Sequence, residues 1–153
     1  TVSLALALAR QLTVTHNRTM KGEWKIIPPY PTPAFYNMKF ATVGFGRIAR
    51  EVMKRTGAFG FERIVYDPFV KQEEMSAAGV QYKSFDELVA EADMISLHLP
   101  LSAATHHLFN KTVFRKMKDG AILINTSRGG LIDTKALAET LQSGRLFAGL
   151  DVF

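Results

Sequence analysis

The chain has 153 residues, 47% of them hydrophobic and 22% charged, which is typical of one soluble globular domain with a substantial core. It contains no cysteine, which excludes a disulfide framework, a thiolate nucleophile and a cysteine-ligated metal. The net charge of +5 comes from scattered lysines and arginines, so we expect a general attraction for anions but no nucleic-acid interface.

The chain opens with TVSLALALAR, where Leu4, Leu8 and Leu12 recur every four residues and predict an amphipathic helix running to about Arg18. The apolar run is too short to cross a bilayer and lacks the basic start of a secretory signal, so we expect no membrane partner and a cytoplasmic location. The missing initiator methionine predicts that the chain begins inside a longer protein. The apolar face of this helix either meets a partner or folds back on the chain's own sheet.

The next segment, IIPPYPTPAFYN (26–37), contains four prolines, which exclude a helix or a central strand and predict an extended connector. Strand-like and helix-like segments then alternate. Strands are expected at 39–45, 61–67, 80–82, 93–100, 121–127 and 146–152. Helices are expected at 46–57, 71–79, 85–92, 111–117 and 133–144.

Two details support the helix assignments. Ser84 and Glu87 have the spacing of a capping box at the start of the helix at 85–92. Ile48, Val52 and Met53 fall on one face of the helix at 46–57. Apolar strands alternating with helices predict an α/β fold: a doubly wound parallel sheet (Rossmann fold) in strand order 3-2-1-4-5-6, with an extra N-terminal helix.

The stretch TVGFGRIA (42–49) lies between a predicted strand and a predicted helix, which is the setting of a dinucleotide-binding turn. Gly44 permits the tight turn, Gly46 lets the backbone approach a pyrophosphate, and Ala49 is small enough for helix–strand packing. The helix start would supply free N–H groups for the phosphates. The alternative is an ordinary turn that contains two glycines.

Asp67 ends the second predicted strand, 23 residues after Gly44, where an acidic side chain accepts hydrogen bonds from the adenosine ribose. Its charge would repel a 2′-phosphate, which favours NAD over NADP. Asp67 could equally form the turn before Pro68, and the two roles are compatible. Arg63 lies within the strand, so we do not expect it to clamp a phosphate.

A third candidate is INTSRGGLID (124–133), in which a buried strand ends in polar residues and glycines. Ligands bind at the carboxyl ends of strands in open α/β sheets, and Arg128 is suited to a bidentate grip on a carboxylate. The alternative is a surface arginine in a loop.

Three stretches together resemble the D-isomer-specific 2-hydroxyacid dehydrogenases: VGFGRIAREV followed by YDP, LVAEADMISLHLP, and MKDGAILINTSRGGLID. The resemblance covers essentially the whole chain, with mild departures at Ala41, Thr42 and Met94. The details FGFERIVYDPF and THHLFN are most similar to the branch that contains the C-terminal-binding-protein corepressors and their bacterial dehydrogenase relatives.

The resemblance implies NAD as the cofactor and assigns its parts to residues. The pyrophosphate would lie on Val43, Gly44, Phe45, Gly46, Arg47 and Ile48. The adenosine ribose would bind Asp67, and the adenine side would be lined by the loop 99–105, including Leu99, Pro100 and Thr105. The nicotinamide would lie beside Thr126, Ser127 and Arg128, with its carboxamide donating to Asp151.

The resemblance also makes Arg128 the catalytic arginine, which binds the substrate carboxylate and polarises the 2-keto oxygen while hydride passes between nicotinamide C4 and substrate C2. The family's acid/base histidine and its glutamate lie beyond Phe153. We expect His98 to pack at a strand end and give His16, His106 and His107 no catalytic role. The histidines lack the spacing of a zinc site, so no metal is expected.

The resemblance therefore predicts that residues 1–153 are an NAD-binding domain truncated at both ends, without the substrate domain, and inactive alone. The family's segment corresponding to the first helix helps to form a homodimer. The substrate would be a small 2-keto or 2-hydroxy acid, whose identity stays open. The alternative is an NAD-sensing, corepressor-like interaction module of the same fold.

Overall fold

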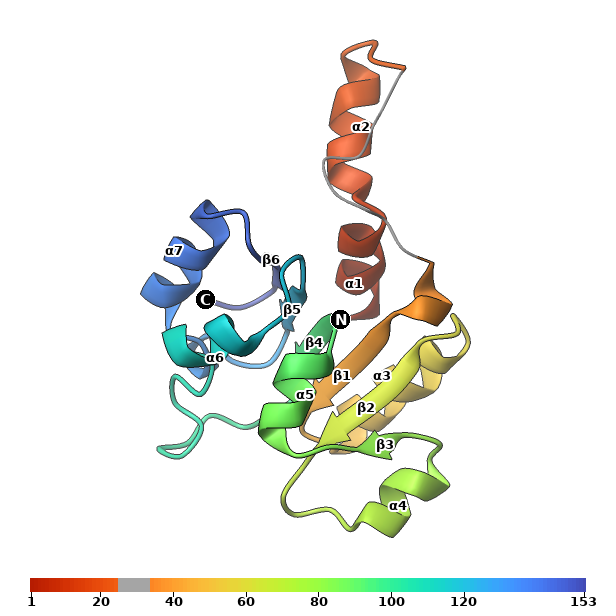
Figure 1. Cartoon of the computed structure of the whole chain (residues 1–153), viewed down its shortest axis with the longest axis vertical. Helices are drawn as coiled ribbons and strands as arrows, with labels where there is room; N and C mark the ends of the chain where they lie inside the picture. The colour runs from red at the N-terminus through yellow and green to blue at the C-terminus, as the bar shows by residue number, and fades with distance from the viewer. Residues whose placement is uncertain (25–33) are drawn as a thin grey trace.

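The computed structural model describes residues 1–24 and 34–153 (Figure 1). The prolines of the expected connector at 26–37 lie outside the described residues. The last part of that segment forms a short 3-10 helix, η1 (Phe35–Asn37), that leads into the first strand.

The centre of the molecule is a parallel sheet of six strands in the order β3-β2-β1-β4-β5-β6, as predicted. The strands are β1 (Lys39–Val43), β2 (Glu62–Tyr66), β3 (Gln81–Tyr82), β4 (Met94–Leu97), β5 (Ile122–Asn125) and β6 (Phe147–Leu150). The strand order reverses between β1 and β4, so the connections that follow these two strands diverge and leave a crevice at their carboxyl ends.

The connections are helical, as the alternating pattern predicted. The helices are α1 (Val2–Ala9), α2 (Leu12–Met20), α3 (Arg47–Gly57), α4 (Gln72–Ala77), α5 (Phe85–Glu91), α6 (Lys111–Lys116) and α7 (Thr134–Gln142), with a 3-10 turn, η2 (Gly129–Leu131). The capping box of Ser84 and Glu87 is present at the start of α5. Within the described ranges, no helix is long and apolar enough to span a membrane.

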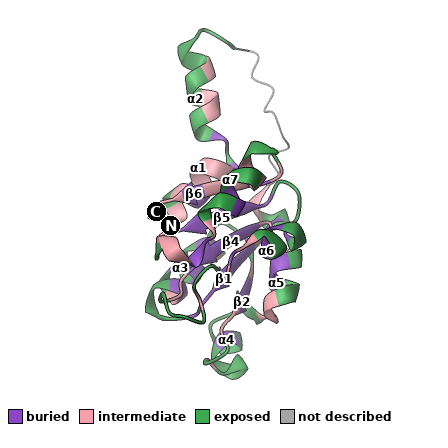
Figure 2. Ribbon diagram, turned by 90° about the vertical axis from the view of Figure 1, so that its left-hand side faces the viewer, coloured by how far each residue is buried: buried purple, intermediate pink, exposed green. Residues whose placement is uncertain are grey.

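The sheet is buried on both faces (Figure 2). Alternate residues of β1 point to opposite sides: Ala41 and Val43 join the core beneath α5, α6 and α7, whereas Phe40 joins the core beneath α1 and α3. Both cores consist of aliphatic and aromatic side chains that are almost completely excluded from solvent. Burial on both faces explains why the strands read as continuous apolar runs.

The N-terminal helix differs from the prediction, because it is interrupted at Gln11. That residue adopts a left-handed conformation (φ 49°, ψ 38°), which ends α1 and redirects the chain into α2. Helix α1 packs on β5 and β6 through Ala5 and Ala9, whereas α2 has no buried residue and extends away from the body (Figure 1). Leu12 is 61% exposed, so the predicted stripe of leucines does not continue into α2.

Candidate functional site

A cavity of about 310 Å³ opens in the crevice at the carboxyl ends of β1, β4 and β5. It brings together the first turn of α3 and the segments that follow β4 and β5, all three of which the sequence singled out. Its lining consists of Gly46, Arg47, Ile48, Ala49, His98, Leu99, Pro100, Thr126, Ser127 and Arg128.

Glycine occupies two positions of the β1–α3 turn for different structural reasons. Gly44 has φ +99°, and a Cβ there would lie 2.5 Å from the carbonyl oxygen of His98. Gly46 has extended backbone geometry, and a Cβ there would meet no atom within 4 Å. Gly44 is therefore required by the fold itself, whereas Gly46 leaves the surface over the start of α3 open to a ligand.

The first turn of α3 forms one wall of the cavity. Its leading N–H groups have no intrahelical acceptor, so they can bind an anion. Ile48 was predicted to lie on one apolar face with Val52 and Met53, but it is 64% exposed, and Ala49 takes its place in the core. The prediction was wrong because the first turn of α3 borders the cavity rather than the sheet.

Val43 and Phe45 are completely buried, so their side chains belong to the core and do not line the cavity. The Arg50 guanidinium lies 4.4 Å from the centre of the Phe45 ring, and its Nε donates to the Phe45 carbonyl oxygen over 3.1 Å. At these two positions, only the main chain could take part in binding.

Asp67 follows β2 and connects two loops. Its Oδ2 accepts a hydrogen bond from the Phe45 N–H, and its Oδ1 accepts one from the Phe69 N–H, each over 2.8 Å. The predicted turn role is therefore confirmed. Because each carboxylate oxygen has a second lone pair, Asp67 can still accept hydrogen bonds from a ligand. Arg63 donates to the Met53 carbonyl oxygen over 3.1 Å, which keeps it at the end of α3.

The loop after β5 is organised by Asn125, which the sequence reasoning did not single out. Its buried amide donates to the Arg128 carbonyl oxygen over 2.8 Å and accepts from the Ser127 N–H over 3.0 Å. Ser127 Oγ also donates to the Leu97 carbonyl oxygen over 2.7 Å, which joins this loop to β4. A polar residue at the end of an apolar strand was the available signal.

Arg128 is the exposed residue of this loop. Its guanidinium donates to the Ser127 carbonyl oxygen over 2.7 Å. Across residues 1–24 and 34–153, no carboxylate forms an ion pair with it. A guanidinium at the cavity with donors to spare can bind a carboxylate.

His98 lies at the end of β4, where its main-chain N–H donates to the Val43 carbonyl oxygen over 2.8 Å. Its Nε2 is 2.9 Å from the hydroxyl of Ser96, which is completely buried. Burial lowers the pKa of the imidazole from 6.5 to about 4. His98 is therefore neutral at pH 7.

The remaining predicted site residues, Thr105 and Asp151, do not line the cavity. Thr105 Oγ1 donates to the Pro100 carbonyl oxygen over 2.7 Å and accepts from the Ser102 N–H, so it shapes the loop after β4. Asp151 is exposed just beyond β6, where its N–H donates to the Asn125 carbonyl oxygen over 3.0 Å.

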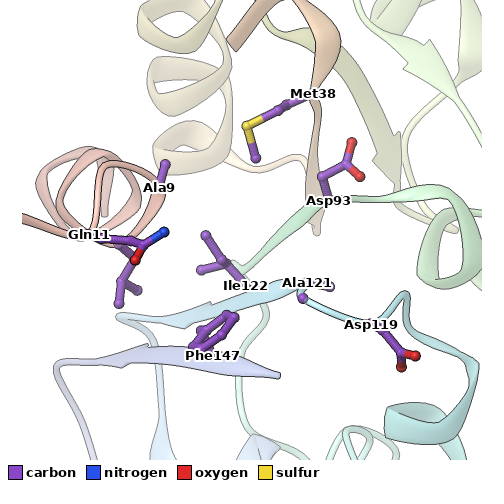
Figure 3. Close-up of a pocket in the computed structure, with 10 residues that line it drawn as sticks. Ala9, Gln11, Met38, Asp93, Asp119, Ala121, Ile122 and Phe147 are labelled. Atoms are coloured by element: carbon purple, nitrogen blue, oxygen red, sulfur yellow. The ribbon is translucent and has the colours of Figure 1, made fainter. Parts of the chain in front are cut away.

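A second cavity, of about 210 Å³, lies at the opposite, amino ends of β4, β5 and β6. Figure 3 shows Gln11 reaching from the α1 side toward Ile122 and Phe147 on the sheet. Two aspartates also line it, but Asp93 accepts from Lys39 N and Lys118 Nζ, and Asp119 accepts from Arg145 Nε. Its carboxylates are thus already paired, and it does not lie at the end of the sheet where ligands of this fold bind.

Comparison with known proteins gives a consistent result. Residues 2–153 match the model of the D-isomer specific 2-hydroxyacid dehydrogenase NAD binding domain. The chain is 40% identical over 153 residues to a hydroxypyruvate reductase of Thermotoga maritima, covering 99% of this chain and 49% of the relative. It is 36% identical over 157 residues to glyoxylate reductase 1 of Saccharomyces cerevisiae, covering 99% and 45%.

Among solved structures, the D-lactate dehydrogenase of Aquifex aeolicus in complex with NAD and lactic acid matches with a TM-score of 0.93 and 37% identity. That match covers 100% of this chain and 46% of the other. The chain thus spans about half the length of the relatives it matches. All three relatives carry enzyme names, which gives no support to the alternative of a corepressor-like module.

Proposed function

Because the chain belongs to the D-isomer specific 2-hydroxyacid dehydrogenases, as their NAD-binding domain, we propose that it binds NAD in the cavity at the carboxyl ends of β1, β4 and β5. The whole protein would transfer hydride between NAD(H) and a small 2-keto or 2-hydroxy acid. The observation that carries this proposal is that one cavity unites the first turn of α3 with the segments after β4 and β5.

The adenosine half of the cofactor would lie on the β2 side. The pyrophosphate would meet the free N–H groups of the first turn of α3, over the open surface of Gly46, with Arg47 nearby. Asp67 would accept hydrogen bonds from the ribose hydroxyls and repel a 2′-phosphate. Leu99 and Pro100 would line the apolar side, with Thr105 holding their loop.

The nicotinamide half would lie on the β5 side, beside Thr126 and Ser127, with Asp151 accepting from the carboxamide. When bound, the nicotinamide supplies or accepts the hydride. Arg128 would bind the substrate carboxylate and polarise the 2-keto oxygen, because it lines the cavity and its guanidinium forms one hydrogen bond, to the Ser127 carbonyl oxygen, among the described residues. The protein's contribution is thus orientation and positive charge.

The half of the relatives that this chain does not match would supply the substrate domain and the acid/base histidine. We therefore expect the chain alone to bind NAD but to be inactive, since general acid–base catalysis typically contributes about 10²–10⁴-fold.

We also expect a homodimer through α1 and α2, because α2 buries none of its residues and Leu12 and Met20 are exposed. The cytoplasm stays our predicted location.

The test is a titration of the purified chain with NADH and, separately, with NADPH, followed by nicotinamide fluorescence and thermal stability. We expect saturable binding of NADH, poor binding of NADPH, and loss of this preference in Asp67→Ala. Asp86→Ala is the matched control, since Asp86 is a surface aspartate that pairs with Lys116 on another part of the molecule. Absence of NADH binding to the folded chain would contradict the proposal.

A further inference from the structure

His98 occupies the central position in the cavity. Strand β4 lies between β1 and β5 in the sheet, with Leu97 paired to Val43 on one side and to Asn125 on the other. The residue after Leu97 therefore faces the cavity between the first turn of α3 and the loop of Thr126. A ligand that spans the two sides must pass over His98.

The hydroxyl of Ser96 contacts one ring nitrogen of His98, so it bears on which nitrogen carries the proton. This hydroxyl is completely buried and must place its hydrogen on an acceptor. Among the described residues, the hydrogen bond of Ser96 Oγ is with His98 Nε2, at 2.9 Å. If Ser96 donates to Nε2, that nitrogen is bare, and in a neutral imidazole the single ring proton is then on Nδ1. The ring thus has one N–H left to donate.

The surroundings favour a neutral ring. Two arginines, Arg47 and Arg128, line the same cavity, and burial lowers the pKa of the imidazole. Thr1 contacts the cavity wall, where its hydroxyl is 2.7 Å from that of Thr126. A protonated imidazole would add a further positive charge beside the two arginines, and the described residues that line this cavity include no aspartate or glutamate. That charge would also face the positive nicotinamide ring of the oxidised cofactor.

We propose that His98 is a positioning residue of this site, whose Nδ1–H donates a hydrogen bond to a sugar hydroxyl on the nicotinamide side of the bound dinucleotide. The inference rests on the proposed function, because it requires the dinucleotide to lie across the end of β4. Ser96 acts through His98: it fixes the orientation of the ring and holds the proton on Nδ1. The pair would set the position of the nicotinamide-side ribose between α3 and Arg128.

The first test is the tautomer. Nitrogen-15 NMR of the imidazoles distinguishes a protonated from a bare ring nitrogen, and we expect His98 to be protonated at Nδ1 in the free chain. On addition of NADH, the resonance of this N–H should move, whereas that of His16, exposed on α2, should not. A proton on Nε2, or an unchanged Nδ1–H at saturating NADH, would overturn the inference.

The second test uses two conservative variants. The amide NH₂ of asparagine can occupy the place of Nδ1, whereas that of glutamine occupies the place of Nε2. We expect His98→Asn to weaken NADH binding by about twofold and His98→Gln by about tenfold, the range of one hydrogen bond. His16→Asn and His16→Gln should leave the affinity unchanged. Equal losses in the two His98 variants, at equal thermal stability, would overturn the inference.

A third variant separates charge from shape. His98→Lys places a permanent positive charge in the cavity, and we expect it to weaken binding of NAD⁺ about tenfold more than binding of NADH. A purely structural defect would weaken both equally, and that result would overturn the role of His98. Wild-type chain that binds neither form would instead contradict the proposed function, so the two failures are distinguishable.

Discussion

Asp67 accepts a hydrogen bond from the main-chain N–H of Phe45 over 2.8 Å, which ties the end of β2 to the turn between β1 and α3. The same carboxylate accepts from the Phe69 N–H. The proposed ribose-binding residue therefore also holds the loop that would receive the pyrophosphate. Cofactor selection and local stability are coupled through one side chain.

This coupling predicts that Asp67→Asn and Asp67→Ala have different effects. Asparagine keeps one acceptor oxygen but removes the charge, so we expect about a tenfold loss of the preference for NADH over NADPH with a small loss of stability. Alanine removes both hydrogen bonds, each to a charged acceptor, so the free energy of unfolding should fall by about 2–3 kcal/mol as well. Urea unfolding and cofactor titration of both variants check this. Equal stability of the two variants would contradict the coupling.

The two glycines of the turn give the second prediction. Gly44→Ala would strain a left-handed backbone and drive a Cβ to 2.5 Å from the His98 carbonyl oxygen, so we expect a loss of about 3 kcal/mol or failure to fold. Gly46→Ala meets no protein atom and should leave the stability nearly unchanged. Its added methyl group occupies the space proposed for the pyrophosphate, so NADH binding should weaken by at least about tenfold.

Thermal unfolding with cofactor titration distinguishes these outcomes. Gly120→Ala is a useful comparison, because Gly120 also has a positive φ (+81°) but no atom within 4 Å of the added Cβ. It should cost less stability than Gly44→Ala, since only the backbone strain remains. A Gly46→Ala chain that binds NADH as tightly as the wild type would count against a pyrophosphate at this position.

The strand order and most elements could be predicted because the strands are apolar on both faces and the helices carry clear caps, such as Ser84 and Asp133. The break at Gln11 could not, since LARQLTV contains neither glycine nor proline and reads as continuous helix. The exposure of Ile48 was missed for a related reason. Helical periodicity identifies a face, but it does not tell which end of that face borders a cavity.

The site was predicted at the level of segments rather than of contacts. The sequence pointed to the stretches around Gly46 and Arg128, and the structure brings both to one cavity. It did not indicate that Asn125 organises the loop or that Ser96 contacts His98, because both depend on pairing between distant strands. Residues that bind a ligand or take part in a reaction can be found from sequence patterns. The polar residues that hold them in place can be identified only from the folded structure.

The role of Asn125 gives a third prediction. Asn125→Ala removes two hydrogen bonds inside a buried site and leaves the Ser127 N–H and the Arg128 carbonyl oxygen without that partner. We expect a loss of about 1–3 kcal/mol in the free energy of unfolding and looser packing of the loop. Amide hydrogen exchange at Ser127 should become faster, while exchange at Thr42 in β1 stays unchanged. Unaltered exchange at Ser127 would refute this role of Asn125.

The last prediction concerns pH. The pKa of His98 is about 4 in the folded chain and 6.5 ordinarily, so between these values the unfolded chain binds a proton that the folded chain does not. The contribution of His98 to the free energy of unfolding is therefore fully present above about pH 6.5 and is lost as the pH falls toward 4. Since one pKa unit corresponds to about 1.4 kcal/mol, the loss is roughly 3 kcal/mol at most. In His98→Gln, urea unfolding between about pH 7 and pH 4.5 should show a shallower decline than in the wild type, whereas His16→Gln should follow the wild type. Parallel curves for wild type and His98→Gln would show that the imidazole is not held neutral by burial.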